Sequence, residues 1–181
     1  DSNKFSLPWL AVDLEIPHYQ LEKIRADKSL FSQAAKLFGY WKENRNVGRF
    51  LEASRKLDAL VEYLHARGVK AIAPVANLVA EDLITGGIAF QDMLETPVTS
   101  VNWDIVSVMM YTSLMTGYSN GIVSREAALW YLYSVMRDVK ERLWDRAGVS
   151  IGVTYVGKLV DEPYYETPEQ LLPDMRAVKA A

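Results

Sequence analysis

Four short apolar runs, separated by helical stretches, predict an α/β protein that is a (β/α)₈ TIM barrel or a fragment of one. The runs span residues 8–14, 70–76, 104–111 and 149–156. They lack a regular apolar-polar alternation, which is typical of parallel strands that are buried on both faces. The order helix, Gly-Val, strand occurs twice, at Gly68-Val69 and at Gly148-Val149. Strands that alternate with helices in this way indicate a layered α/β fold.

Two long helices are predicted from apolar periodicity and from the residues at their ends. The first covers residues 50–67, where leucines recur on one side, and Gly68 supplies the glycine that commonly follows a helix. The second covers residues 125–146. Ser124 is its expected N-cap, and Gly148 is expected to close it.

A third helix opens near the end of the chain, and two connections are longer than a turn requires. The segment Thr167-Pro168-Glu169-Gln170 is a capping box with proline at the first helical position, and Pro173 is expected to kink or split the helix that follows. The long connections span residues 18–49 and 78–101. Such connections are expected on the functional rim of a barrel.

The four β-α units amount to half of a barrel. A complete (β/α)₈ domain needs about 250 residues, whereas this chain has 181. We therefore expect residues 1–181 to form a single domain that is part of a larger barrel. The alternative is an open sheet or a dimer of half barrels, since an isolated half barrel would expose two strand edges.

The composition excludes several classes of function. The chain has no cysteine, which rules out disulfides, thiol catalysis and cysteine-ligated zinc. Its formal net charge is −3, whereas a nucleic-acid-binding protein normally presents a basic face. No apolar run reaches the roughly 18 residues of a membrane-spanning helix. We expect no nucleic acid, no membrane span and no cofactor, and the oligomeric state stays open.

Polar and aromatic side chains follow the ends of the predicted strands. In a parallel barrel every strand points its carboxyl end to the one face where an active site forms. The residues expected at that face are Asp13, Glu15, Asn77, Tyr111, Thr112, Tyr155, Asp161 and Glu162.

Asp13 and Glu15 are the expected catalytic pair. Carboxylates two residues apart on a strand point to the same side, where like charge raises one pKa and prepares a general acid. Alternatively, Asp13 binds neighbouring backbone and Glu15 lies at the solvated rim. Glu15 and Glu162 form a second possible acid and nucleophile pair. A metal site with His18 is disfavoured, because no second histidine approaches it.

Aromatic residues have two readings. Trp9, Trp130 and Trp144 lie within strand or helix patterns and are expected to be covered. Other aromatic residues fall near loops, where they either stack on sugar rings or pack the loops down. They are Tyr40, Trp41, Trp103, Tyr118, Tyr164 and Tyr165.

Three segments together resemble the chitinase-like, family-eighteen-type glycoside hydrolases. Asp13-Leu14-Glu15-Ile16-Pro17 resembles the D-x-E-x-P end of the fourth strand in that family, and residues 106–111 resemble its sixth strand, which ends in Met-x-Tyr. Residues 150–157 resemble the seventh strand. The segments occur in the family's order and cover about a fifth of the chain.

The resemblance implies a function and roles for three residues. Glu15 would be the general acid that protonates the leaving oxygen, Asp13 its partner, and Tyr111 the residue that positions the substrate. The ligand would be a poly- or oligosaccharide and the protein extracytoplasmic or secreted. Ala11 and Thr112 stand where the family usually has aspartates. A non-catalytic carbohydrate-binding or partner-binding barrel is therefore the alternative.

Overall fold

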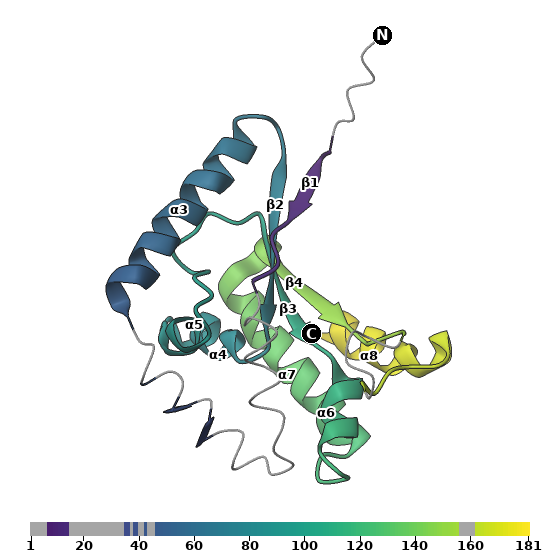
Figure 1. Ribbon diagram of the computed structural model, residues 1–181. Helices are drawn as coiled ribbons and strands as arrows, with labels where there is room; N and C mark the ends of the chain where they lie inside the picture. Colours follow the sequence, from purple (N-terminus) through teal and green to yellow (C-terminus); the bar gives the residue numbers. More distant parts are fainter. Residues whose placement is uncertain (1–6, 15–34, 37, 40–41, 43–45, 156–161) are drawn as a thin grey trace. The chain divides into compact units, whose positions relative to one another are not determined.

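The chain forms an α/β protein, which confirms the predicted fold class (Figure 1). The computed structural model describes residues 7–14, 35–36, 38–39, 42, 46–155 and 162–181. The chain divides into two compact units, residues 1–104 and residues 105–181. In each unit a pair of parallel strands is connected through helices. The closed barrel and the single domain stay predictions.

Unit 1 holds two strands and three helices. They are β1 (Trp9–Ala11), α3 (Val47–His65), β2 (Lys70–Ala76), α4 (Val79–Thr85) and α5 (Ala89–Leu94). β1 pairs in parallel with β2, with Trp9 opposite Lys70 and Ala11 opposite Ile72. The predicted run 8–14 is therefore a short strand, followed by a single bridge from Leu14 to Val75. α4 and α5 occupy the stretch that the sequence suggested as a long connection.

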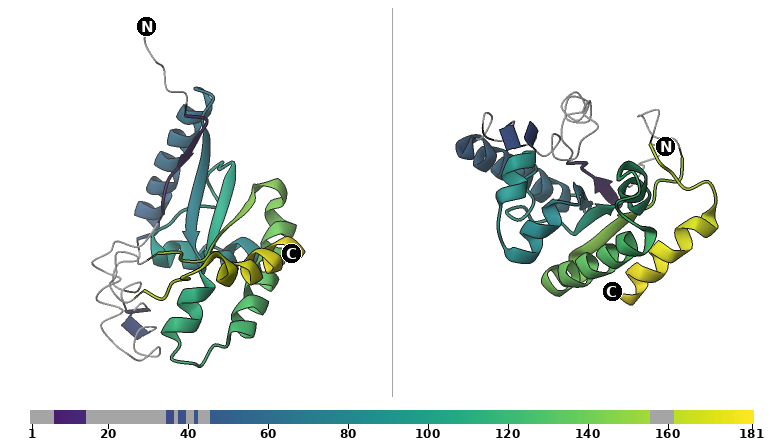
Figure 2. Two further views of the ribbon diagram at one scale, coloured as in Figure 1. Left: turned by 90° about the vertical axis from the view of Figure 1, so that its right-hand side faces the viewer. Right: turned by 90° about the horizontal axis from the view of Figure 1, so that it is seen from below.

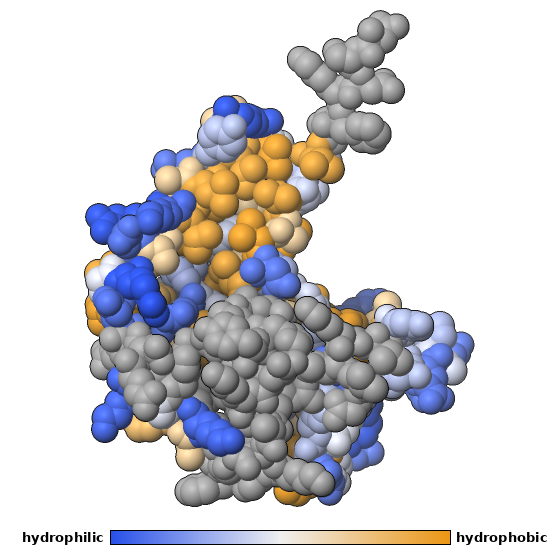
Figure 3. Space-filling model, in the orientation of Figure 1, coloured by the Kyte–Doolittle hydropathy of each residue, from blue (hydrophilic) through white to orange (hydrophobic). Residues whose placement is uncertain are grey.

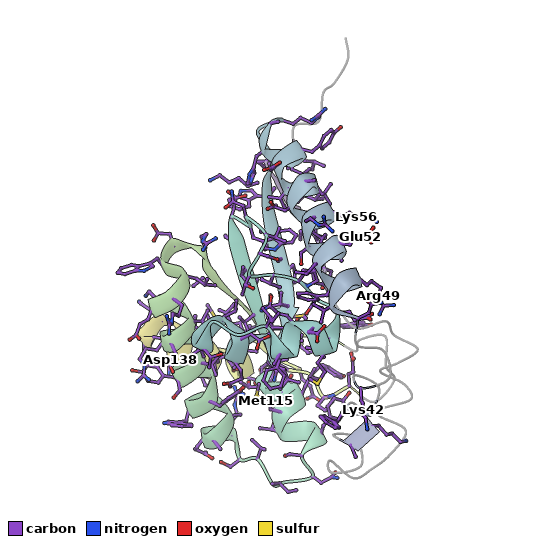
Figure 4. All side chains as sticks on the ribbon, turned by 90° about the vertical axis from the view of Figure 1, so that its left-hand side faces the viewer. Lys42, Arg49, Glu52, Lys56, Met115 and Asp138 are labelled. Carbon is purple, nitrogen blue, oxygen red and sulfur yellow. The ribbon has the colours of Figure 1, made fainter. Side chains whose placement is uncertain are left out.

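Packing in unit 1 is strongest along β2. Ala71, Ala73 and Val75 on this strand have no exposed surface. α3 buries Phe50 and Val61, and its N-terminus is capped by Asn46. On the outer surface of the helix, Glu52 and Lys56 form an ion pair of 2.7 Å one turn apart (Figure 4). Burying the apolar stripe of α3 stabilises it more than such a surface pair can.

A buried polar network holds the chain after α5. The backbone N–H of Gln91 donates to Asp82 Oδ2 at 2.7 Å. The side-chain oxygen of Gln91 accepts from the N–H groups of Val98 and Thr99 at 2.8 and 2.9 Å. Gln91 has no exposed surface, so water cannot replace these bonds. The network fixes the path of the chain between α5 and the end of unit 1.

A second polar contact joins the ends of α3 and β2 to Asp104. Asp104 Oδ2 accepts from the Ala71 N–H and contacts His65 Nε2, both at 2.8 Å. Burial acts to raise the pKa of Asp104, but the hydrogen bonds from Ala71 and His65 and the charges of His65 and Lys70 outweigh it and hold that pKa below its usual value. The carboxylate form of Asp104 is therefore the form that the fold favours.

Unit 2 places two strands beside four helical segments. They are β3 (Ile105–Met110), α6 (Thr112–Tyr118), α7 (Arg125–Leu143), the short 3-10 helix η1 (Trp144–Arg146), β4 (Ala147–Ile151) and α8 (Pro168–Ala180). β3 and β4 run parallel, from Val106 opposite Ala147 to Met110 opposite Ile151. α7 packs on β4, and α8 packs on α7 (Figure 2).

The predicted carboxyl end of the second long helix is wrong. α7 begins after Ser124, which accepts a hydrogen bond from the Ala127 N–H as expected. It ends at Leu143, where Trp144 takes a positive φ of 52°. Gly148 lies inside β4 and does not close the helix. Its role is close packing, because a Cβ there would lie 2.6 Å from Cγ2 of Ile105.

The predicted kink or split at Pro173 is also wrong, because α8 runs without a break from Pro168 to Ala180. The capping box is confirmed: Thr167 and Gln170 satisfy each other's backbone groups, and Pro168 stands at the start. Pro173 removes one intrahelical bond near the start of α8. The helix tolerates that loss because its first turn is capped.

Three tryptophans that were expected to be covered lie at the surface. Trp9, Trp130 and Trp144 are 39%, 69% and 77% exposed. Trp9 and Leu10 point to opposite faces of β1, and both are exposed. Figure 3 shows hydrophobic residues gathered over the part of unit 1 that α3, β1 and β2 form. In the part of the chain that the structure describes, no helix is long and apolar enough to cross a membrane.

The Gln91 network predicts a large loss of stability for Gln91→Ala. The change leaves the N–H group of the buried Val98 without an acceptor, at about 1–3 kcal/mol, and removes the acceptor of the Thr99 N–H at the surface. We expect the free energy of unfolding to fall by about 1–3 kcal/mol, measured by urea denaturation. The control is Glu62→Ala, which changes an exposed residue of α3 and should alter the free energy of unfolding very little. Equal losses in the two variants would contradict the role of the network.

The Asp104 contacts predict a loss of stability that depends on pH. Because folding lowers the pKa of Asp104, the carboxylate stabilises the fold above its unfolded pKa, and that contribution disappears as the pH falls through the folded pKa. Asp104→Asn should cost about 1–3 kcal/mol at pH 7. The difference from the wild type should shrink steadily below about pH 4. Urea denaturation across this range measures it, and a difference that is constant with pH would contradict the assignment.

Candidate functional site

In unit 1, two predicted site residues lie at the same end of the strand pair. Asp13 follows β1 and Asn77 follows β2. The strands run parallel up to the bridge between Leu14 and Val75, and the Leu14 N–H donates to the Pro74 carbonyl at 3.2 Å. Asp13 is exposed and Asn77 half-buried. Both are therefore accessible at the carboxyl ends of β1 and β2.

Several predicted residues lie outside the described part of the chain. Glu15, the proposed acid, and Asp161 are among them, as are His18, Tyr40 and Trp41. The possible pairs of Glu15 with Asp13 and with Glu162 are therefore without a measured distance, and the roles given to these residues stay predictions.

In unit 2, three predicted site residues follow the strands as expected. Tyr111 stands directly between β3 and α6, is half-buried, and its carbonyl accepts from the N–H groups of Leu114 and Met115. Tyr155 lies beyond the end of β4 and is 78% exposed. Glu162 is half-buried. Tyr111 and Tyr155 thus belong to the carboxyl-end side of the β3–β4 pair.

The structure does not support a substrate-binding role for Trp103. This residue is 1% exposed and precedes β3, so it lies at the amino end of that strand and not at the carboxyl end. Its ring is buried and has no free face for a sugar. Trp103 is therefore one of the loop aromatics that pack within the protein and do not stack on a sugar ring.

A buried polar cluster lies just past the carboxyl ends of β3 and β4. Asp174 on α8 has no exposed surface. The Thr112 hydroxyl donates to its Oδ1, and Nη2 of Arg125 donates to its Oδ2. The Tyr165 hydroxyl donates to Oδ2 at 3.2 Å. The cluster therefore joins residues from α6, α7, α8 and the segment before α8.

Electrostatics explain why this cluster is stable. A buried carboxylate is costly unless it is paired and hydrogen-bonded, and Asp174 has both kinds of partner. Nη1 of Arg125 donates to the hydroxyls of Thr112 and Tyr165, and its guanidinium carbon lies 4.9 Å from the centre of the Tyr165 ring. Burial, followed by the charge of Asp174, raises the pKa of Tyr165, which keeps its hydroxyl protonated.

An open pocket of about 450 Å³ lies beside the cluster. Its lining comes from α6, the start of α7, the segment before α8 and the first turns of α8: Ser113, Thr116, Gly117, Arg125, Pro163, Tyr164, Tyr165, Gln170 and Pro173. α6 begins directly after β3, so the pocket lies at the carboxyl-end side of the strand pair. That is where ligands bind in parallel α/β folds.

Two features of the pocket wall come from single residues. Gly117 packs directly on Pro163, because a Cβ at position 117 would lie 2.2 Å from the proline Cγ. Ser113 is 4% exposed, and its hydroxyl has no hydrogen-bond partner among the described residues. A buried hydroxyl without a partner is costly, so Ser113 provides an unused hydrogen-bonding group at this wall.

The pocket offers recognition chemistry without an acid. Its described lining residues include no carboxylate, and its polar groups are hydroxyls, an amide and the guanidinium of Arg125. The rings of Tyr164, Tyr165 and the two prolines supply apolar surface. Among the residues that the structure describes, no group of three or more His, Asp or Glu side chains is placed to hold a metal ion.

Sequence reasoning missed the centre of this cluster. Thr112 and Tyr165 were noted as strand-end and loop residues, but Arg125 and Asp174 were not distinguished from other charged helix residues. A pattern that could have found Asp174 is its spacing on α8: it lies three residues after Leu171 and four before Val178, on the side that packs inward. A carboxylate on a packed helix face indicates a buried cationic partner.

Comparison of the chain with models of protein families, with curated proteins and with solved structures finds no match.

The cluster predicts that two neighbouring tyrosines respond differently to loss of the hydroxyl. Tyr165→Phe removes the group that bonds to Asp174 and to Thr112, the latter at 2.6 Å. We expect the free energy of unfolding to fall by about 1–2 kcal/mol, because one bond is to a charged group. Tyr164→Phe, whose residue is 39% exposed, should change stability by less than about 0.5 kcal/mol. Urea denaturation measures the free energy of unfolding of both variants. The same loss in both would contradict the stabilising role of the Tyr165 hydroxyl in the cluster.

Proposed function

We propose that this chain is all or part of a glycoside-hydrolase-like (β/α)₈ barrel that binds a poly- or oligosaccharide at the carboxyl ends of its strands. The observation that carries the proposal is the pocket beyond β3 and β4, which combines aromatic walls with hydroxyls, an amide and a guanidinium whose charge is paired with Asp174. An extracytoplasmic location, where such saccharides are found, is part of the proposal.

Repetition of the β-α-β arrangement supports the barrel. In both units the strands are parallel and the connection between them contains a helix of 19 residues. Parallel strands with this connection build barrels and doubly wound sheets. β1 is exposed on both faces, and the hydrophobic area beside it (Figure 3) is of the kind that further barrel elements cover.

The chemistry of the pocket supports a sugar ligand. A pyranose ring presents an apolar face that packs on flat rings and an edge of hydroxyls that donate and accept hydrogen bonds. Tyr164 and Tyr165 supply rings, and Ser113 supplies a hydroxyl that no described residue engages. The volume of about 450 Å³ falls within the range of roughly 300–1,000 Å³ for small-molecule sites.

Hydrolysis is the favoured activity of the proposed barrel, with Glu15 as the general acid. The sequence Asp13-x-Glu15 directly follows β1, where barrel enzymes place catalytic residues. Tyr111 follows β3 in the same manner and would position the substrate. A positioned acid contributes roughly a hundred- to ten-thousand-fold to the rate.

Binding without hydrolysis is the second candidate function. It is favoured by one observation: the pocket has no carboxylate among its described lining residues, whereas glycoside hydrolysis ordinarily uses two. In that case the protein is a carbohydrate-binding barrel, and Glu15 is a solvated rim residue.

A glycan panel with Glu15→Gln separates these functions. If the protein is a hydrolase, the wild type releases reducing sugar, and Glu15→Gln lowers the rate by at least about a hundredfold while it still binds the glycan. Glu62→Gln on the exposed side of α3 is the control and should keep the full rate. Binding by the wild type without release selects the second candidate. If no glycan in the panel binds, the proposed function is wrong.

A further inference from the structure

Three features that ordinarily attract anions come together at the pocket in unit 2. The first is the guanidinium of Arg125, whose side chain is 29% exposed. The others are the N-termini of α7 and α8, which contribute Arg125 and Gln170 to the lining. Helix N-termini carry partial positive charge and unpaired N–H groups. By themselves these features would favour a carboxylate or phosphate on the ligand.

Each of the three features already has a partner within the chain. Arg125 is paired with the fully buried carboxylate of Asp174. At the start of α7, Ser124 accepts from the Ala127 N–H, and Glu126 lies in the first turn. At the start of α8, the capping box is complete, and Glu169 lies in the first turn. The partial positive charge at the N-terminus of each helix is therefore already compensated by its capping residue and by the glutamate in its first turn.

The charges around the pocket extend this balance. The pKa values of Glu126 and Glu169 are lowered, chiefly by hydrogen bonds to their own backbone N–H groups, so both are ionised at neutral pH. Glu162 and Glu166 flank the segment 163–165 that forms one wall. None of these carboxylates lines the pocket, and the one cation among its described lining residues is Arg125, whose charge is already paired with Asp174.

The hydrogen-bonding groups that have no partner among the described residues carry no unpaired charge. The hydrogen bonds of Arg125 use Nη1 and Nη2 and leave its Nε–H as a donor without a partner among the described residues. Ser113 adds a buried hydroxyl that can donate and accept. Together they suit a sugar hydroxyl or an amide carbonyl. A carboxylate would lose its hydration here and gain no net opposite charge.

We infer that this pocket takes an uncharged saccharide group and rejects a carboxylate, and that Asp174 sets this preference by cancelling the charge of Arg125. The inference rests on the proposed function, because it concerns which saccharide binds. Asp174 has no exposed surface, so it acts through Arg125 and does not touch the ligand.

The test compares matched neutral and acidic ligands. Calorimetry would measure binding of oligomannose against oligomannuronate, and of oligogalactose against oligogalacturonate, each pair of equal length. The Glu15→Gln background prevents cleavage during the measurement. We expect at least one neutral ligand to bind about tenfold or more tightly than its uronate, since one unfavourable charge contact of about 1.4 kcal/mol corresponds to that factor.

Three variants locate the origin of the preference. Asp174→Asn leaves the charge of Arg125 unpaired and should reduce the neutral-over-acidic ratio at least threefold, a shift that a structural role alone would not produce. Should Asp174→Asn not fold, the double variant Arg125→Gln with Asp174→Asn removes both charges. It should bind every ligand more weakly, because the Nε–H donor of Arg125 is lost, but should still favour the neutral ligand over its uronate. Glu166→Gln at the rim should reduce the ratio less. Glu141→Gln, roughly 24 Å away along α7, is the matched control and should leave it unchanged.

The outcomes separate the inference from the proposed function. A uronate that binds as tightly as its neutral partner overturns the inference and leaves saccharide binding intact. The role of Asp174 is overturned if Asp174→Asn folds and keeps the full preference for neutral ligands. It is also overturned if the double variant loses that preference. Failure of every saccharide to bind overturns the proposed function itself.

Discussion

Parallel pairing of the strands is the constraint on which the other features of both units depend. Two parallel strands cannot be joined by a tight turn, so the chain must cross back through a helix before the next strand begins. α3 serves this purpose in unit 1, and α7 does so in unit 2. The same constraint sends the residues after β1 and β2 to one edge, and those after β3 and β4 to one edge. Candidate ligand-binding groups gather there because of the topology.

Within unit 2, a single buried carboxylate then fixes how the elements after the strands are arranged. Asp174 can remain charged without solvent only if α6, α7 and the segment before α8 all bring donors to it. The hydrogen bonds of Thr112, Arg125 and Tyr165 meet this demand. Two residues of the pocket wall, Arg125 and Tyr165, are therefore held in place by hydrogen bonds to the buried Asp174. This favours a preformed site.

The sequence predicted the strands better than the site. The run 70–76 matches β2 at both ends, and 104–111 differs from β3 by one residue at each end, because these buried strands have a clear apolar composition. The runs 8–14 and 149–156 extend too far at their carboxyl ends, since β1 ends at Ala11 and β4 spans Ala147–Ile151. The role of Gly148 was misjudged because this glycine serves close packing against Ile105 within β4. The expected kink at Pro173 was wrong because α8 continues through this residue. The cluster joins residues 62 positions apart, and no local pattern records such a contact. The sequence left two readings open for Trp103, because an aromatic near a loop has the same local sequence whether it faces solvent or the core.

The close contact between Gly117 and Pro163 has a consequence for variation at this wall. A Cβ at position 117 would overlap the proline ring, so even alanine would push α6 and the tyrosine-bearing segment apart and widen the opening beside Arg125. The residue at position 117 therefore limits the width of the pocket. In a protein of this architecture with a larger residue there, the tyrosine-bearing segment must lie farther from α6, and we expect the pocket to accommodate a larger ligand.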